Sequence, residues 1–335
     1  VKQKESNRKN RYFIIIMEQQ TLISELAKDT LRGLTSKPKF LLSKYFYDDA
    51  GSTLFQKIMQ MPEYYLTDCE HEIFSGQKDA FLQAFSDDSK GFNLVELGSG
   101  DGLKTKILLN HFVQKKVDFQ YIPIDISSKA NKELTQSLER DIPGVKISPL
   151  TGDYFHELQR LNSQYRKRKV IFFLGSNIGN FSSKETEIFL SHLSGFTNKG
   201  DKILIGFDLK KSPVVIMNAY NDPHGHTRRF IFNHLKRINR ELDGNFMVGN
   251  FEHHCHYDPE SGALKSYLIS KTDQDVSINL GKSIGFRQWE PVFMELSRKF
   301  DLESIEQLAT QNRFKVIQHF SDQRNYFVDS LWEKS

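Results

Sequence analysis

From residue 92 onward the chain alternates short β-rich runs with helical stretches, and this rhythm constrains the fold more than any other feature. The expected strands are residues 92–97, 119–126, 145–150, 170–174 and 202–208. The stretches near 103–114, 128–140, 155–163 and 184–195 are expected to be helices. This alternation is typical of a parallel sheet with helices on its faces. We therefore predict an α/β fold for this part of the chain.

Residues 210–299 do not keep that rhythm. A basic helix is expected over about 226–242, and β-like runs interrupted by glycines follow it. Further helices are expected at 18–36, 52–60 and 69–85, with proline at position 62 ending the second. We predict a smaller α+β domain beside a sheet-forming core. The expected division is 1–16 as a disordered extension before Met17, 17–68 and 209–299 as the smaller domain, and 69–208 and 300–335 as the core.

Composition excludes several classes of protein. The formal net charge of +4 is too small to indicate nucleic-acid binding by itself. The two cysteines, Cys69 and Cys255, form no C-x-x-C pair, which favours a reducing compartment. No apolar stretch approaches the roughly 20 residues of a membrane helix. We predict a cytoplasmic monomer without a membrane or nucleic-acid partner.

The strongest motif is Glu96-Leu97-Gly98-Ser99-Gly100-Asp101-Gly102, at the end of the first expected strand. Glycines there allow a sharp turn against a ligand. A dinucleotide site needs G-x-G-x-x-G, whereas these glycines are spaced G-x-G-x-G with an acid two residues ahead. A carboxylate at Glu96 suits a cationic cofactor and repels a pyrophosphate. The motif favours S-adenosylmethionine, although a glycine-rich turn without a ligand remains an alternative.

Acidic residues also follow the next two expected strands. Asp125 can accept both ribose hydroxyls of a nucleoside, and Asp153 can accept the adenine amino group with Tyr154 against the ring. An ordinary loop acid is the alternative for each of them. The loop after the fourth strand lacks the Asn/Asp-Pro-Pro-aromatic tetrad typical of enzymes that methylate base amino groups. This absence argues against a nucleic-acid base as substrate.

Two other clusters carry no predicted function. His253-His254-Cys255-His256 resembles a metal site, but neighbouring residues on a strand point to opposite faces, so we predict no metal. The basic residues near 228–240 are expected to form a solvated helix face. The last part of the chain is predicted to be a helix over 302–311 and a strand pair, 314–320 and 325–332. Such a pair is common in methyltransferase sheets and unusual in dehydrogenases.

The chain resembles the histidine Nα-methyltransferase family of the ergothioneine pathway, which makes hercynine. Related fungal members methylate a prenylated tryptophan. The resemblance extends from about residue 40 to residue 300. It is carried by the segments 46–55, 61–67, 96–100 with Lys104-Thr105, 175–180, 219–222, 239–242 and 295–299.

The resemblance implies a class I, Rossmann-like methyltransferase domain and a role for individual residues. The implied cofactor residues are Glu96, Gly98, Ser99, Gly100, Lys104, Asp125, Asp153 and Tyr154. The implied substrate residues are Tyr47, Phe55, Tyr64, Gly175, Asn177, Asn180, Tyr220, Ser266, Glu295 and Ser297. Tyr47 and Asn180 are the implied catalytic pair, because they orient the amine.

Glu295 and Ser297 are two residues apart, so on a strand they point to the same face. A carboxylate beside a hydroxyl can satisfy both nitrogens of a neutral imidazole. A solvated strand face is the alternative, since Arg298 and Lys299 follow directly. Two departures from the family bear on the substrate: Asn177 replaces a threonine, and Ser266 stands where some members have methionine.

We therefore predict an enzyme that methylates the α-amino group of L-histidine with S-adenosylmethionine, up to the trimethyl product. The alternatives are methylation of another amine, such as a tryptophan derivative or a modified histidine, and a non-catalytic protein that binds S-adenosylmethionine. An NAD-dependent oxidoreductase is a further alternative, which the glycine spacing disfavours.

Overall fold

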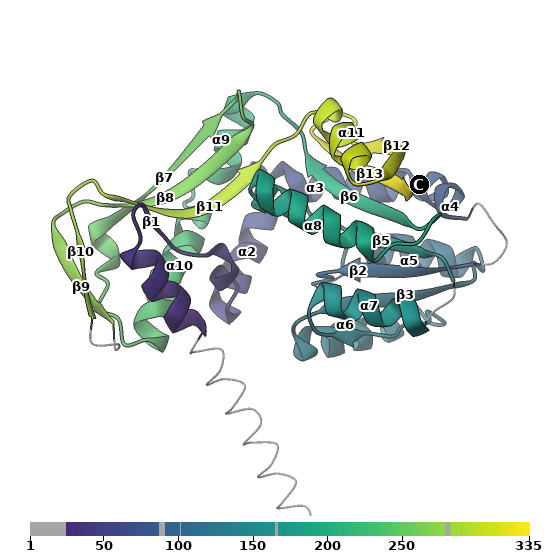
Figure 1. Ribbon diagram of the computed structural model, residues 1–335, viewed down its shortest axis with the longest axis horizontal. Coiled ribbons are helices and arrows are strands. Elements are labelled where there is room, and N and C mark those ends of the chain that lie inside the picture. Colours follow the sequence, from purple (N-terminus) through teal and green to yellow (C-terminus); the bar gives the residue numbers. More distant parts are fainter. Residues whose placement is uncertain (1–24, 87–90, 101, 165–166, 279–281) are drawn as a thin grey trace, which may run out of the picture. The chain divides into compact units, whose positions relative to one another are not determined.

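The computed structural model describes residues 25–86, 91–100, 102–164, 167–278 and 282–335 (Figure 1). The predicted extension at 1–16 and the start of the expected helix at 18–36 lie outside the described residues, and residues 25–35 are helical. The chain divides into two compact units. The larger unit comprises Tyr64–Ser212, Pro259–Ala263 and Ser297–Ser335; the smaller comprises, among the described residues, 25–63, Pro213–Asp258 and Leu264–Leu296. Within the described ranges, no helix is long and apolar enough to span a membrane.

The larger unit is built on a seven-stranded sheet with the order β12-β13-β6-β5-β2-β3-β4. Its strands are β2 (Phe92–Leu97), β3 (Phe119–Asp125), β4 (Leu150–Thr151), β5 (Lys169–Phe173), β6 (Lys202–Asp208), β12 (Phe314–Ser321) and β13 (Phe327–Lys334). The first five of these pair in parallel, and β13 lies antiparallel to both β6 and β12. Strands β2, β5 and β6 are buried along their whole length, as expected for a sheet covered on both faces. The predicted α/β fold with a C-terminal antiparallel pair is confirmed.

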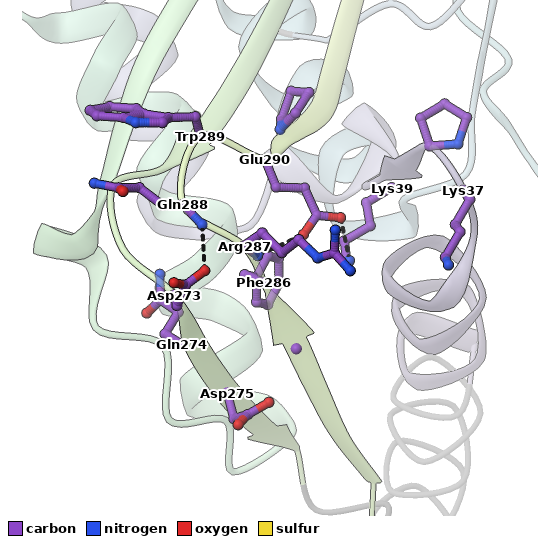
Figure 2. A pocket seen from close by; sticks show the side chains of 13 residues that line it. Lys37, Lys39, Asp273, Gln274, Asp275, Phe286, Arg287, Gln288, Trp289 and Glu290 are labelled. Carbon is purple, nitrogen blue, oxygen red and sulfur yellow. Dashed lines mark hydrogen bonds and ion pairs between the residues drawn. The ribbon is translucent and has the colours of Figure 1, made fainter.

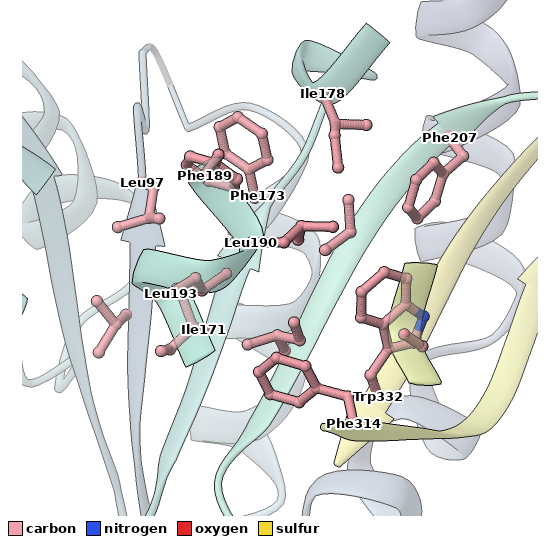
Figure 3. Packing of buried hydrophobic residues seen from close by; sticks show 14 of the residues in the cluster. Leu97, Ile171, Phe173, Ile178, Phe189, Leu190, Leu193, Phe207, Phe314 and Trp332 are labelled. Carbon is pink, nitrogen blue, oxygen red and sulfur yellow. The ribbon is translucent and has the colours of Figure 1, made fainter. Parts of the chain in front are cut away.

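Helices cover both faces of this sheet. They are α3 (Tyr65–Gly76), α4 (Lys78–Phe85), α5 (Thr105–Gln114), α6 (Ser128–Asp141), α7 (Tyr154–Gln164), α8 (Ser183–Gly195) and α11 (Leu302–Gln311). On one face, Ile171 and Phe173 pack with side chains of α7, α8 and α11 (Figure 3). On the other face, the ring of Phe172 packs against Phe74 of α3 and Phe85 of α4. The alternation along β5 thus supplies one core on each side of the sheet.

Two elements of this unit differ from the sequence prediction. The single helix expected at 69–85 is two helices, α3 and α4, because Gln77 between them leaves the helical region with φ −119°. The strand expected at 145–150 is reduced to β4 and an isolated bridge between Tyr121 and Ile147. Pro149 has no backbone N–H to donate to a neighbouring strand, which prevents a continuous ladder there.

The smaller unit combines helices with two groups of strands, in which β1 pairs with β11 in parallel and β9 with β10 antiparallel. Its sheet has the order β1-β11-β8-β7, and β9 and β10 form a separate hairpin. The strands are β1 (Lys39–Phe40), β7 (Phe251–Asp258), β8 (Ala263–Ser270), β9 (Gln274–Ile278), β10 (Lys282–Phe286) and β11 (Pro291–Arg298). The helices are α2 (Asp49–Met59), α9 (Pro213–Tyr220) and α10 (His226–Glu241), with 3-10 turns η1 (Ser43–Phe46) and η3 (Val248–Asn250).

Asp48 joins α2 to α10 and explains why α2 begins at residue 49. Its side chain accepts a hydrogen bond from the Gly51 N–H at 2.7 Å, which caps the helix N-terminus. The same carboxylate accepts from Asn233 at 2.7 Å and pairs with Arg240 at 2.5 Å. The helix expected at 52–60 therefore starts earlier than its apolar spacing indicated.

Candidate active site

The glycine-rich loop after β2 has the backbone shape that only glycine adopts without strain. Gly98, Gly100 and Gly102 have φ values of 73°, 53° and 63°. A Cβ atom on Gly98 would lie 2.6 Å from the hydroxyl oxygen of Tyr154. The predicted cofactor residues Gly98 and Tyr154 therefore lie against each other, with no room for a side chain between them. Asp101 lies outside the described residues.

Glu96 is buried below this loop rather than presented on its surface. Its carboxylate accepts hydrogen bonds from the Thr105 hydroxyl at 2.7 Å and from the Tyr121 hydroxyl. Burial raises the pKa of Glu96 to about 7, although both hydrogen bonds act in the opposite direction. The sequence suggested that Glu96 faces a cationic cofactor. In the structure its bonded partners are protein groups, and these bonds tie the end of β2 to α5 and β3.

Asp125, Asp153 and Tyr154 gather at the carboxyl ends of β3 and β4. Asp125 accepts from the Ser127 N–H at 2.8 Å, and Asp153 accepts from the N–H groups of Phe155 and His156 at 3.0 and 3.2 Å. Burial raises the pKa of Tyr154 to about 12, and the charges of Asp125 and Asp153 add to the effect. The two acids are thus close enough to act on the Tyr154 phenol. Parallel strands bring the three residues to one edge of the sheet, where ligands bind in such folds.

Glu70 is a site residue that the sequence analysis missed. It is 1% exposed, pairs with the ammonium of Lys104, and accepts a hydrogen bond from the Gly175 N–H at 2.8 Å. Burial alone would lower the pKa of Lys104, but Glu70 outweighs it and the pKa is raised. Glu70 thereby links a predicted cofactor residue to the loop after β5. The sequence signal that could have revealed Glu70 is its position on the apolar face of α3, between the buried residues Leu66 and Ile73.

The loop after β5 also turns through left-handed backbone. Gly175 and Ser176 have φ values of 72° and 57°, and the turn η2 (Asn177–Asn180) follows. The Asn177 side chain donates to the Leu174 carbonyl at 2.9 Å and so closes its own turn. Asn180, at the end of the turn, is exposed. Asn177 and Asn180 are thus both exposed, and a hydrogen bond within the loop holds the Asn177 side chain.

A second buried charge network lies where β6 ends. Asp208 is fully buried and accepts from the Tyr65 hydroxyl at 2.9 Å, from the Lys299 ammonium at 2.7 Å, and from Lys211. Lys299 also donates to the Ser297 hydroxyl at 2.8 Å. Lys299 is therefore no part of a solvated strand face, which was the alternative for this segment. The network fixes the position of Ser297 through a buried lysine.

In the smaller unit, predicted substrate residues meet around Tyr47. Its ring contacts Phe55 with centroids 5.4 Å apart, and Phe230, which the sequence analysis missed, also at 5.4 Å. The Tyr47 side chain is 48% exposed. Packing around the phenol raises the pKa of Tyr47 above its ordinary value, and the charges of Glu295 and Tyr220 contribute. Tyr47 consequently keeps its proton near neutral pH and can donate a hydrogen bond.

Ser266 has a different environment from the other predicted substrate residues. It lies on β8, is fully buried, and its hydroxyl oxygen has no hydrogen-bond partner within the described part of the chain. An unpaired buried hydroxyl costs free energy unless a ligand or water satisfies it. The Ser266 hydroxyl is therefore able to form a hydrogen bond with a polar group of a bound molecule.

The predicted residues divide between the two units. Tyr47, Phe55, Tyr220, Ser266 and Glu295 belong to the smaller unit. Tyr64, Gly175, Asn177, Asn180, Ser297 and the predicted cofactor residues belong to the larger unit. The cofactor set is thus carried by the sheet-forming unit alone.

A separate pocket of about 860 Å³ opens in the smaller unit beside β1 and the β9–β10 hairpin (Figure 2). The Gln288 N–H donates to Asp273 at 2.9 Å on one side of it, and Lys39 pairs with Glu290 at 2.5 Å on another. None of the residues predicted to bind substrate or cofactor lines this pocket. The sequence analysis gave it no role.

The histidine-rich segment of β7 forms no evident metal centre. Within the described ranges, no group of three or more His, Cys, Asp or Glu side chains is arranged to hold a metal ion. His253 is half-buried, and its ring nitrogens are buried without a hydrogen-bond partner there; burial lowers its pKa to about 4. His253 is consequently neutral near pH 7.

The glycine loop after β2, the acids after β3 and β4, and the antiparallel pair that ends the sheet define a class of enzyme. They are the features of a class I, S-adenosylmethionine-dependent methyltransferase. The sequence profile of the family described as "Histidine-specific methyltransferase, SAM-dependent" matches residues 26–334. The chain belongs to this family.

Named relatives agree with this assignment. The histidine N-alpha-methyltransferase of Mycolicibacterium smegmatis is 33% identical over 281 residues, covering 84% of this chain and 86% of the relative. The enzyme of the same name from Mycobacterium tuberculosis is 32% identical and covers 92% of this chain and 95% of the relative. Ergothioneine biosynthesis protein 1 of Schizosaccharomyces pombe is 28% identical over 84% of this chain, which spans 37% of that protein.

Proposed function

We propose that this enzyme transfers methyl groups from S-adenosylmethionine to the α-amino nitrogen of L-histidine, up to the trimethylated product hercynine. The observation that carries the proposal is the match of the histidine-specific family to residues 26–334. Glu295 and Ser297 of β11 supply the acceptor and hydroxyl that a neutral imidazole needs. The 33% identity to the M. smegmatis histidine N-alpha-methyltransferase gives further support.

The cofactor supplies an electrophilic methyl group on a cationic sulfur. The residues present fit this group, because a Cβ atom on Gly98 would lie 2.6 Å from the Tyr154 hydroxyl, so only glycine lets the loop lie this close to Tyr154. Asp125 and Asp153 would hold its ribose and adenine, and Lys104 the carboxylate of its amino acid tail. The work of these residues is to place the reacting carbon, which is the main source of rate in a direct transfer.

The amine needs orientation more than a strong base. The α-amino group of a peptide titrates near pH ~8. In free histidine the neighbouring carboxylate raises that pKa, so the reactive neutral amine is a minor form that the site must select. Its lone pair forms the new N–C bond while the C–S bond breaks, and the displaced proton passes to solvent. Tyr47 is protonated at neutral pH, as an ordinary phenol is, and its raised pKa adds to this; it therefore orients the amine by hydrogen bonding rather than acting as an anionic base. Asn180 is the second orienting group.

The test is to incubate the purified protein with S-adenosylmethionine and single amino acids and to follow the products by mass. Histidine should gain up to three methyl groups. Glu295→Gln should raise KM for histidine at least tenfold, or about 1.4 kcal/mol, without changing the affinity for S-adenosylhomocysteine. Glu252→Gln, on an exposed position of β7 in the same unit, is the matched control. Turnover of tryptophan but not histidine would contradict the proposal.

The unpaired hydroxyl of Ser266 supports a second candidate substrate, a histidine with a polar substituent on its side chain. Such a substituent could satisfy this buried group. Ser266→Met would remove both the space and the hydroxyl. If a modified histidine is the true substrate, this variant should lose activity on it while keeping activity on histidine.

We also infer that the enzyme acts on its small-molecule substrate as a monomer in the cytoplasm. Both cysteines, Cys69 and Cys255, are free and buried, which suits a reducing compartment. Light scattering of the purified protein measures its mass in solution. A dimer would refute the inference about assembly.

A further inference from the structure

Asp329 is a buried acid that the proposed chemistry does not use. It lies in β13, where Gly206 of β6 and Phe320 of β12 are its partners across the sheet. The residue is fully buried, and neither carboxyl oxygen has a hydrogen-bond partner within the described part of the chain. An ionised carboxylate in that position would cost several kcal/mol. A neutral, protonated Asp329 side chain would avoid this cost.

The charged group with the largest effect on the pKa of Asp329 is Glu70 of α3. A Cβ atom on Gly206 would lie 2.9 Å from Glu70 Oε1 and 3.2 Å from Asp329 Oδ1, so the two carboxyl groups face the same small space. Glu70 raises the pKa of Asp329, after the larger effect of burial, and Lys104 opposes both. The partners on β6 and β12, Gly206 and Phe320, do not titrate.

Of the two carboxyl groups, Asp329 is the one expected to carry a proton. Glu70 holds the ammonium of Lys104 and the N–H of Gly175, and both contacts stabilise a charged carboxylate. Asp329 has neither contact. A neutral carboxylic acid, unlike a carboxylate, can donate a hydrogen bond, and Glu70 has the acceptor oxygen that faces it.

We propose that Asp329 is a positioning residue for cofactor binding: it stays protonated and donates to Glu70, so that a single negative charge stands behind Lys104. The three side chains then carry no net charge together. The Lys104 ammonium has three donors, of which Glu70 takes one, and the others can meet the anionic tail of a cofactor. An ionised Asp329 would add a second negative charge and weaken that contact. The inference rests on the proposed role of Lys104 in holding the cofactor carboxylate.

The first test reads the protonation state directly. Infrared spectra are recorded on the Glu96→Gln protein, because the pKa of Glu96 is about 7 and this buried acid would add a band of its own at neutral pH. The spectra should contain the carbonyl stretch of a buried protonated carboxylic acid. This band should disappear when Asp329→Asn is added and remain when Glu333→Gln, at a partly exposed acid of the same strand, is added instead. Absence of the band from the Glu96→Gln protein, or its survival after Asp329→Asn is added, would overturn the proposal.

The second test measures the dissociation constant of S-adenosylhomocysteine by calorimetry. Asp329→Asn keeps a donor and adds no charge, so its affinity should lie within about threefold of the unaltered protein. Asp329→Leu removes the donor and should weaken binding about tenfold. A change above tenfold in Asp329→Asn would indicate that a charge was lost and refute the proposal. Unchanged binding by Asp329→Leu would also refute it; if that variant does not fold, the asparagine variant and the infrared band decide. Histidine takes no part in either test, so failure of the proposed substrate would be seen separately.

Discussion

Replacing Glu96 by glutamine should make the larger unit more stable above neutral pH. Glu96 is buried at the end of β2, and burial raises its pKa from 4.5 to about 7. Glutamine has nearly the same shape and can still bond to the hydroxyls of Thr105 and Tyr121. The substitution therefore removes a charge that the buried site disfavours while keeping the contacts that tie β2 to its neighbours.

The sign and size follow from proton linkage. Between pH 4.5 and about pH 7, unfolded Glu96 has lost a proton that folded Glu96 retains. The free energy of unfolding therefore falls as pH rises through this window, and the full loss is present above it. A tenfold change in an equilibrium constant corresponds to about 1.4 kcal/mol, so the displaced pKa represents about 3 kcal/mol. Glutamine does not titrate, so the free energy of unfolding of Glu96→Gln should not fall in this way as the pH rises.

Urea unfolding of the cofactor-free protein at about pH 5 and about pH 8 measures the effect. Trp332, which is fully buried in the same unit, reports the transition by its fluorescence. The stability difference between Glu96→Gln and the unaltered protein should grow by about 2 kcal/mol or more from the lower to the higher pH. Glu252→Gln, an exposed substitution, should show no such growth. Parallel pH profiles for the Glu96 variant and the unaltered protein would refute the reasoning.

Three further substitutions test other parts of the structure. Gly98→Ala should raise the Kd of S-adenosylhomocysteine, measured by calorimetry, at least about tenfold. The backbone of residue 98 is left-handed, and the new Cβ would lie 2.6 Å from the Tyr154 hydroxyl. Asp48→Ala should lower the free energy of unfolding by about 2 kcal/mol, measured with urea, since it removes a helix cap and two side-chain contacts. Lys299→Met should lower the free energy of unfolding by about 3 kcal/mol, because it leaves the buried Asp208 carboxylate without this partner. It should also raise KM for histidine, because Ser297 loses its bond to Lys299, while the affinity for the cofactor stays unchanged. Equal KM values for the variant and the unaltered protein in steady-state kinetics would contradict the second expectation.

The sequence alone determined the central sheet and its cofactor loop. Buried parallel strands read as short apolar runs, and the strands at 92–97 and 202–208 were placed at their observed bounds. Gly98 and Gly100 were assigned to a tight turn because few other residues adopt a positive φ. Asp125 and Asp153 could be grouped because the ends of parallel strands meet at one edge. These features depend on local spacing, which a single sequence displays directly.

The tertiary structure alone decided which polar groups pair in the interior. Glu70, Lys104 and Asp329 come from α3, the segment before α5 and β13, and no local pattern joins them. Lys299 directly follows β11 and Arg298, in a segment whose charges suggest an exposed position, yet Asp208 at the end of β6 holds it in the core. The division of the expected helix at 69–85 into α3 and α4 was likewise invisible in its spacing. Periodicity reports which face of an element is buried, whereas the partner of a buried charge depends on what the fold brings opposite it.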